Sequence, residues 1–129
     1  MSYCTEVKQF SDACNDSNPT NPKLMTTEAI AFIREMVNDE LDELEEATNT
    51  IEQADALVDA IYYICDTAVR HGMNLDPLFS IVHRANMQKV VDGKVLRRED
   101  GKILKPEGWE DPEPYLRREM ENQEKNGSW

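Results

Sequence analysis

The sequence predicts an all-α fold: an antiparallel helix bundle completed by oligomerisation, with a small C-terminal hairpin in a basic arm. Apolar residues recur at the helical period through two long segments, and only five glycines and six prolines interrupt the chain. A strand-like pattern is confined to residues 95–104. Two long amphipathic helices in a chain of 129 residues favour packing against partner helices.

The first helix is expected over residues 3–14, and the Asn- and Pro-rich segment 15–25 is expected to be a loop. Thr26 or Thr27 is the expected N-cap of the next helix, which runs to about residue 47. The apolar residues of this helix are spaced at three and four positions, as on one helical face.

Thr50 and Gln53 form a capping-box pattern that starts another long helix, and Gly72 is its expected end. Its apolar stripe runs through Ile51, Ala54, Leu57 or Val58, Ile61, Ile64 or Cys65, and Ala68. Asp76, followed by a proline, is the expected N-cap of a further helix that fades near Val90.

Residues 95–104 predict a hairpin that turns at Asp100-Gly101. From Tyr115 onward a short polar helix or a frayed tail is expected. No linker composition divides the chain, so residues 1–129 are predicted to form one domain. Its helical core covers about residues 27–90, and its basic hairpin and loop arm about residues 91–112.

The composition excludes several classes of function. A net charge of −12 argues against nonspecific binding to nucleic acid, which needs a basic surface. No apolar run reaches the length of a membrane span, and the N-terminus lacks the pattern of a signal peptide. The three cysteines show no metal-ligand spacing. A reducing, cytoplasmic location is therefore expected.

Charge is divided unevenly along the chain. Residues 28–66 hold twelve acids and one base, whereas residues 83–105 hold seven bases and three acids. An acidic site followed by a basic arm suits a metal-bound polyanion, with metal on the carboxylates and phosphates on the lysines and arginines. The plain alternative is charge compensation between neighbouring segments.

The acidic residues point to a cation site. Asp39, Glu40 and Glu43 share one helical patch, and Asp55 precedes Asp59 by one turn on the next helix. Asp59 has apolar neighbours, which is a costly place for an unpaired carboxylate. If the helices pack antiparallel, the two groups face each other and form an all-oxygen site for Mg²⁺ or Mn²⁺. The alternative is a solvated acidic face.

These residues resemble the metal motif of the all-α nucleoside triphosphate pyrophosphohydrolases, the MazG-like group that includes dimeric dUTPases and phosphoribosyl-ATP pyrophosphohydrolase. Residues 39–43 (DELDE) resemble its ExxE-like part, and residues 59–63 (DAIYY) the end of its ExxD part. Downstream, HRANMQK (83–89), RREDGK (97–102) and LKPEGW (104–109) resemble a MazG-like subgroup with a basic arm. The similarity covers about residues 27–110. Members of this group are dimers or tetramers, so the resemblance implies a homodimer or a homotetramer.

The chain departs from this motif at two positions. Asp39 stands where the family usually has Glu, and Ala56 stands where the Glu of ExxD is expected. Asp55 is a candidate substitute for the missing ligand. Glu52 with Asp55 also fits ExxD, so a second register is open; the tyrosines after Asp59 favour the first register.

The resemblance implies hydrolysis between the α and β phosphates of a nucleotide, with release of a monophosphate and pyrophosphate. Implied metal ligands are Asp39, Glu40, Glu43, Asp59 and Asp55, and the catalytic residues are expected among Asp39, Glu40 and Glu43. Carboxylate-bound Mg²⁺ suits this chemistry because it neutralises phosphate charge and acidifies bound water. The candidate substrate-binding residues carry amide or basic side chains: Asn86, Lys89, Lys105, Arg84, Arg97 and Arg98.

Three functions remain at this level. The leading one is a Mg²⁺-dependent pyrophosphohydrolase acting on a (deoxy)nucleoside triphosphate. The second is a phosphoribosyl-ATP pyrophosphohydrolase, which the basic arm and the KPEGW segment fit less well. The third is a non-catalytic acidic helical interaction module, which the alanine at position 56 keeps open.

Overall fold

The structure is a computed structural model, and it describes residues 2–15 and 17–129. The described residues form five helices: α1 (Tyr3–Cys14), α2 (Thr27–Glu46), α3 (Thr50–Arg70), α4 (Leu75–Met87) and α5 (Glu113–Asn126). One small antiparallel sheet joins β1 (Val90–Val91) to β2 (Lys94–Val95). The all-α fold class is thereby confirmed, and none of these helices is long and apolar enough to cross a membrane.

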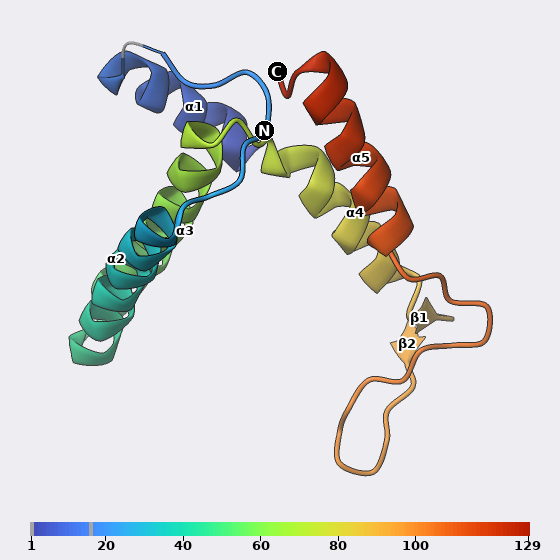
Figure 1. Cartoon of the computed structure of the whole chain (residues 1–129). Coiled ribbons are helices and arrows are strands. Elements are labelled where there is room, and N and C mark those ends of the chain that lie inside the picture. The colour runs from blue at the N-terminus through green and yellow to red at the C-terminus, as the bar shows by residue number, and fades with distance from the viewer. Residues whose placement is uncertain (1, 16) are drawn as a thin grey trace.

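The helices form two arms that diverge from a common apex (Figure 1). In one arm α2 packs along α3, with α1 against the end of α3 near the apex. In the other arm α4 packs against α5, and the sheet and its loops extend from the far end. The basic arm is therefore separated, within one chain, from the α2–α3 pair.

The apolar core lies where α1 meets the end of α3. Cys4, Val7, Cys65, Ala68 and Val69 are buried there, and Met73 and Leu75 pack against them. All three cysteines of the chain are free thiols, and Cys4 and Cys65 are both in this core. Because the core is small, most of the stripe that the sequence predicts on α3 lies outside it.

Asp76 joins the two arms. Its carboxylate accepts hydrogen bonds from the backbone amides of Cys4 and Thr5, each at 3.1 Å, and from the Thr5 hydroxyl at 2.7 Å. Asp76 thus caps the N-terminus of α1, although it lies in the first turn of α4. The expectation that Asp76 caps its own helix is wrong: Asn74 does so, through its side-chain oxygen and the amide of Asp76.

The end of the chain closes the apex. The side-chain amide of Gln123, which is 1% exposed, donates to the carbonyl of Asn74 and its oxygen accepts from the Asn74 amide. The Ser128 amide donates to the Thr20 carbonyl at 2.8 Å. Gly72 ends α3 with a φ of 70°, as expected, and a side chain there would collide with the Asn21 carbonyl. These contacts attach α5 to the turn between α3 and α4.

The starts of the long helices agree with the sequence in part. Thr26 caps α2, because its hydroxyl accepts from the Ala29 amide at 3.1 Å. At α3 the cap is Asn49, one residue before the predicted capping box, and it accepts from the Glu52 amide at 2.9 Å. The Glu52 carboxylate in turn accepts from the Thr48 amide at 3.3 Å. Asn49 takes the position because a side-chain oxygen there reaches the free amides of the first turn.

The basic arm contains two turns where the sequence predicts one. Arg97 pairs with Ile103 around the expected Asp100-Gly101 turn. A second turn at Asp92-Gly93, with φ values of 52° and 76°, joins β1 to β2. Two successive positive φ values are typical of the tight turns that connect antiparallel strands. The sequence shows this turn only weakly because each flanking strand has two residues.

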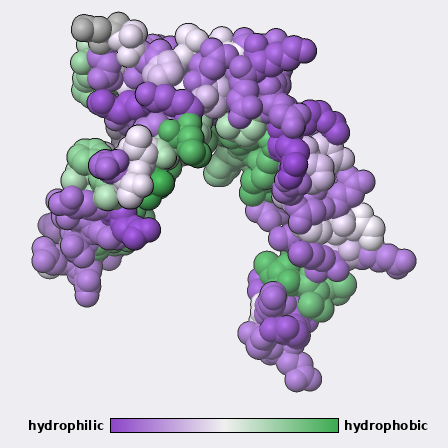
Figure 2. All heavy atoms as spheres, viewed as in Figure 1, coloured by the Kyte–Doolittle hydropathy of each residue, from purple (hydrophilic) through white to green (hydrophobic). Residues whose placement is uncertain are grey.

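Large apolar side chains remain exposed along both arms. On α3, Ile51 is 80% exposed and Val58 58%, and on α4 Phe79 is 75% exposed. Figure 2 shows hydrophobic residues gathered on the sides of the two arms that face each other near the apex, and again beside the sheet. The predicted stripe on α3 exists, but the chain by itself covers only part of it.

Candidate functional site: a carboxylate group beside a cavity

Glu40 is the buried residue of α2. Its side chain lies in the seam between α2 and α3, the residue is 8% exposed, and its Oε2 has no hydrogen-bond partner among the described residues. A buried carboxylate without donors is unfavourable for folding. A carboxylate oxygen of this kind is a donor that hard cations such as Mg²⁺ accept.

Three further carboxylates act on Glu40. Burial, then the neighbouring carboxylate of Glu43, and then repulsion from Asp59 and Asp55 raise the pKa of Glu40. Burial also raises the pKa of Asp59, with smaller contributions from Asp55 and Glu43. We call these four residues the carboxylate group. Mutual repulsion of this kind is relieved when a cation binds between the charges.

The structure brings together most, but not all, of the predicted metal ligands. Asp39 is exposed on α2 and is outside the carboxylate group. Asp59, which the sequence predicts to be buried, is only partly buried, and the buried carboxylate is Glu40 instead. In the part of the chain that is described, no three acidic, His or Cys side chains converge closely enough to hold a metal ion as they stand.

Ala56, at the position where the family motif has Glu, is buried and 3% exposed. The helix that carries it, α3, packs along α2. Asp55, one position earlier and exposed, contributes its negative charge to the carboxylate group instead.

A cavity of about 310 Å³ opens beside the carboxylate group, with walls from α1, α2 and α3. Glu40 and Asp59 line one part of it. Phe10 and Tyr62 line another, with their rings edge to face and their centroids 6.2 Å apart. The remaining lining residues are Ser11, Cys14, Tyr63, Asp66 and Arg70. The sequence did not reveal that α1 belongs to the site, because a single phenylalanine on a short helix is not distinguishable from a core residue.

Three of the predicted substrate-binding residues gather around Trp109 in the basic arm. The ammonium groups of Lys89 and Lys105 lie 5.2 and 4.8 Å from the centre of its ring. Lys89 also donates to the side-chain oxygen of Asn86 at 3.2 Å. The indole of Trp109 donates to the Ala85 carbonyl at 2.7 Å, which attaches this group to the end of α4. Cation–π contact fixes both lysines on one ring.

Arg97 and Arg98 belong to the turn of the hairpin. Arg97 donates to the Gly101 carbonyl at 2.8 Å. Arg98 forms two hydrogen bonds to Asp100, at 3.0 and 2.5 Å, and this contact raises the pKa of Arg98 and lowers that of Asp100. The structure therefore gives both arginines a local structural partner and does not bring them to the carboxylate group.

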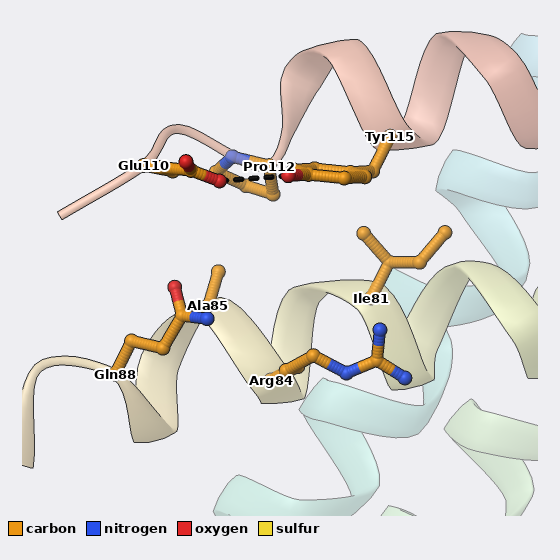
Figure 3. Close-up of a pocket in the computed structure, with 7 residues that line it drawn as sticks. All are labelled: Ile81, Arg84, Ala85, Gln88, Glu110, Pro112 and Tyr115. Carbon is orange, nitrogen blue, oxygen red and sulfur yellow. Dashed lines mark hydrogen bonds between the residues drawn. The ribbon is translucent and has the colours of Figure 1, made fainter.

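Arg84 lines a different, smaller pocket of about 110 Å³ between α4 and the start of α5 (Figure 3). On the side of this pocket opposite α4, the hydroxyl of Tyr115 donates to Glu110 at 2.7 Å. Its other lining residues are Ile81, Ala85, Gln88 and Pro112. Arg84 is thus separated from both the carboxylate group and the cavity beside it.

Comparison with known proteins agrees with the resemblance. The family model of phosphoribosyl-ATP pyrophosphohydrolase matches residues 7–86, a range that begins in α1, includes the carboxylate group and ends before the basic arm. A comparison with curated proteins finds none that matches the chain. The matched range exceeds half of the chain. The chain therefore belongs to the phosphoribosyl-ATP pyrophosphohydrolase family, within the MazG-like nucleoside triphosphate pyrophosphohydrolases, and it is a pyrophosphohydrolase that acts on the phosphoanhydride bond of a nucleotide triphosphate.

Proposed function

We propose that the protein hydrolyses a (deoxy)nucleoside triphosphate between its α and β phosphates, with Mg²⁺ as cofactor and Mn²⁺ as a substitute. The observation that carries this proposal is the buried Oε2 of Glu40, which lies beside three other carboxylates and at the edge of a cavity. Oxygen donors of this kind are those that Mg²⁺ prefers. Family membership supports the class of reaction.

Each carboxylate has a distinct part in this proposal. Glu40 and Asp59 are the ligands that already face the cavity, and the exposed Glu43 and Asp55 rotate inward to complete the set. When bound, Mg²⁺ supplies charge neutralisation at the phosphates and lowers the pKa of a water molecule. Asp39, which is exposed and outside this set, accepts the proton of the attacking water.

The phosphate-binding residues come from a second copy of the chain. Asn86, Lys89 and Lys105 lie at the far end of the α4–α5 arm, whereas the carboxylate group lies on the other arm (Figure 1). Two copies that pack their exposed α3 and α4 faces together bring opposite charges towards each other. We therefore propose a homodimer, or a homotetramer built from two such dimers, in which the site is completed between subunits.

Phosphoribosyl-ATP is the second candidate substrate. The family whose model matches the chain is named for this activity. The match ends at residue 86, and the basic arm and the KPEGW segment beyond it favour the MazG-like subgroup and hence a simple nucleoside triphosphate. The membership of an enzyme family argues against the third possibility, a non-catalytic interaction module.

The deciding experiment measures pyrophosphate release from standard and non-standard nucleoside triphosphates and from phosphoribosyl-ATP, with and without Mg²⁺. Glu40→Gln and Glu43→Gln should each abolish release while the far-UV helical signal is unchanged. Glu45→Gln is the matched control, because Glu45 is an exposed glutamate of the same helix outside the carboxylate group. Retained activity in both Glu40→Gln and Glu43→Gln would refute the metal assignment. Activity on phosphoribosyl-ATP alone would select the second candidate.

A further inference from the structure

We propose that the cavity beside the carboxylate group holds the nucleoside part of the substrate, with the base against Phe10 and Tyr62 and its edge contacting the Asp66–Arg70 ion pair. This inference rests on the proposed function, since it places the nucleoside next to the metal-bound phosphates. It assigns the stacking of the base to α1 and α3, and the choice of base to the last turns of α3.

The two ends of the cavity differ in chemistry. Glu40 and Asp59 line the acidic end. Asp66 and Arg70 also line the cavity and form an ion pair at 2.7 Å. Asp59 and Asp66 are two helical turns apart on α3, which is roughly 10 Å along the helix axis. That length accommodates a sugar and a base between the phosphate end and the ion pair.

The aromatic residues between these ends are open to contact. Phe10 is 60% exposed, Tyr62 39% and Tyr63 37%. Large aromatic side chains this accessible in a cavity wall are suited to stacking against a planar ring. Because every base has a π-face, stacking holds the base without selecting it. Selection then depends on the polar groups that reach the edge of the base.

The Asp66–Arg70 pair provides those polar groups. A carboxylate accepts from the amino or imino groups of a base, and a guanidinium donates to its carbonyl or ring nitrogens. Both side chains are partly exposed, 24% for Asp66 and 49% for Arg70, so their remaining donors and acceptors are accessible. Ser11 also lines the cavity, but it is 1% exposed and its hydroxyl accepts from the amides of Asn15 and Asn18.

Cys14 gives the wild-type protein an internal reporter of this cavity. It lines the cavity and is an exposed free thiol. Cys4 and Cys65 are both buried. Burial raises the pKa of Cys4 to about 11 and also raises the pKa of Cys65. Only thiolates react rapidly with alkylating agents, so Cys14 should be modified first.

The first test follows alkylation of Cys14 by mass spectrometry, with each of the four free deoxynucleosides and without metal. At least one deoxynucleoside should slow the modification in the wild type. Phe10→Leu, which keeps an apolar side chain but removes the ring, should lose most of this protection. Phe32→Leu is the control, because Phe32 is 58% exposed on α2 and does not line the cavity. Equal protection in Phe10→Leu, or no protection by any deoxynucleoside, would overturn the proposal.

The second test compares kcat/KM for the four deoxynucleoside triphosphates in Asp66→Asn. The ranking of the bases should change by about tenfold or more, because the substituted amide presents a donor where the carboxylate presents an acceptor. Glu113→Gln is the control, since Glu113 forms the same type of ion pair with Arg117 on α5. An unchanged ranking in Asp66→Asn would contradict the role of the pair.

The nucleoside cavity and the proposed hydrolysis are refuted by different outcomes. Protection of Cys14 without any turnover would support the nucleoside cavity and refute the proposed hydrolysis. Turnover without protection, and without an effect of Phe10→Leu on KM, would support the hydrolysis and refute the nucleoside cavity.

Discussion

Glu40 occupies a position where its charge opposes folding. One oxygen of this buried carboxylate lacks a hydrogen-bond donor, and burial together with the neighbouring carboxylates raises its pKa. The sequence identifies Glu40 as one of three acids on a helical patch, but the period of a helix does not say which of them faces the seam with α3. Only the packing of α2 on α3 separates buried Glu40 from exposed Asp39.

The raised pKa of Glu40 predicts how stability depends on pH. Its ordinary value is 4.5 and that of Asp59 is 3.8, and both are raised in the folded protein. The folded state therefore holds these protons more tightly than the unfolded state. Their contribution to stability is complete below the ordinary values and is lost as the pH rises through the raised ones.

We therefore expect the metal-free protein to lose stability as the pH rises above the ordinary pKa values of these two groups, and Glu40→Gln to lose less over the same rise. Urea unfolding at several pH values measures the difference. Glu45→Gln should follow the wild type. Parallel curves for wild type and Glu40→Gln would show that Glu40 does not carry the effect.

Mg²⁺ should raise the melting temperature of the wild type, because a cation that binds only the folded carboxylate group stabilises it by mass action. Glu40→Gln should show little or no increase. Differential scanning fluorimetry across a range of Mg²⁺ concentrations measures the shift, with Ca²⁺ and Na⁺ for comparison. Equal shifts in the two proteins would place the bound cation elsewhere.

At the level of elements, the sequence predicts the helices well and their ends less well. The predicted first helix has the observed bounds, and the caps of α3 and α4 lie one and two residues earlier than predicted. Several neighbouring polar residues can take the N-cap position of a helix, and contacts with distant residues decide which of them does. Asp76 shows this directly, because its carboxylate is taken by α1, a helix more than seventy residues away in sequence.

Asp76→Ala should loosen α1, because the amides of Cys4 and Thr5 lose their acceptor. The loss of a helix cap costs about 0.5–2 kcal/mol. Urea unfolding measures the change in stability, and amide hydrogen exchange at residues 4 and 5 locates it. Asp42→Ala, at an exposed position of α2, is the control. Unchanged exchange at these two amides would contradict the capping role.

Mutation of Lys89 and Lys105 tests whether these lysines contact the phosphates of the substrate. Lys89→Ala combined with Lys105→Ala should raise KM for the nucleotide, while the far-UV helical signal stays unchanged, because both lysines are held on Trp109 outside the apolar core. Lys94→Ala with Lys102→Ala is the control pair in the same arm. Truncation before Val91 is a poorer test, since it also removes α5, whose Gln123 closes the apex.

The shape of the whole molecule is the part that one sequence predicts least. The stripe on α3 indicates a buried face, but periodicity does not say whether the chain itself or a second copy covers it. The buried core is confined to the meeting of α1 and α3, and Val58 and Phe79 remain more than half exposed. Burying one such side chain contributes roughly 1.5–3 kcal/mol, so several of them together can hold two copies in a dimer.

In the proposed dimer, the basic-arm lysines of one copy complete the carboxylate group of the other. The activity of a mixture of two inactive variants can therefore be predicted. Glu40→Gln keeps the two lysines but has a defective carboxylate group. The double variant Lys89→Ala, Lys105→Ala lacks the two lysines but keeps an intact carboxylate group. After subunit exchange, half of the dimers are hybrids, and each hybrid holds one site with both parts intact. The mixture should therefore regain about one quarter of wild-type activity, although each variant alone is inactive or weak.

The control for this experiment is a third protein that cannot form hybrids. Val58→Glu places a charge at an exposed apolar position of α3, away from the buried core, and should shift the protein towards monomers in light scattering with its helical signal retained. Adding Val58→Glu to both partners should abolish the recovery. The mixture could also stay inactive while wild-type subunits exchange normally. The carboxylate group and the basic-arm lysines would then act within one chain, and the α2–α3 and α4–α5 arms of that chain would have to close on each other.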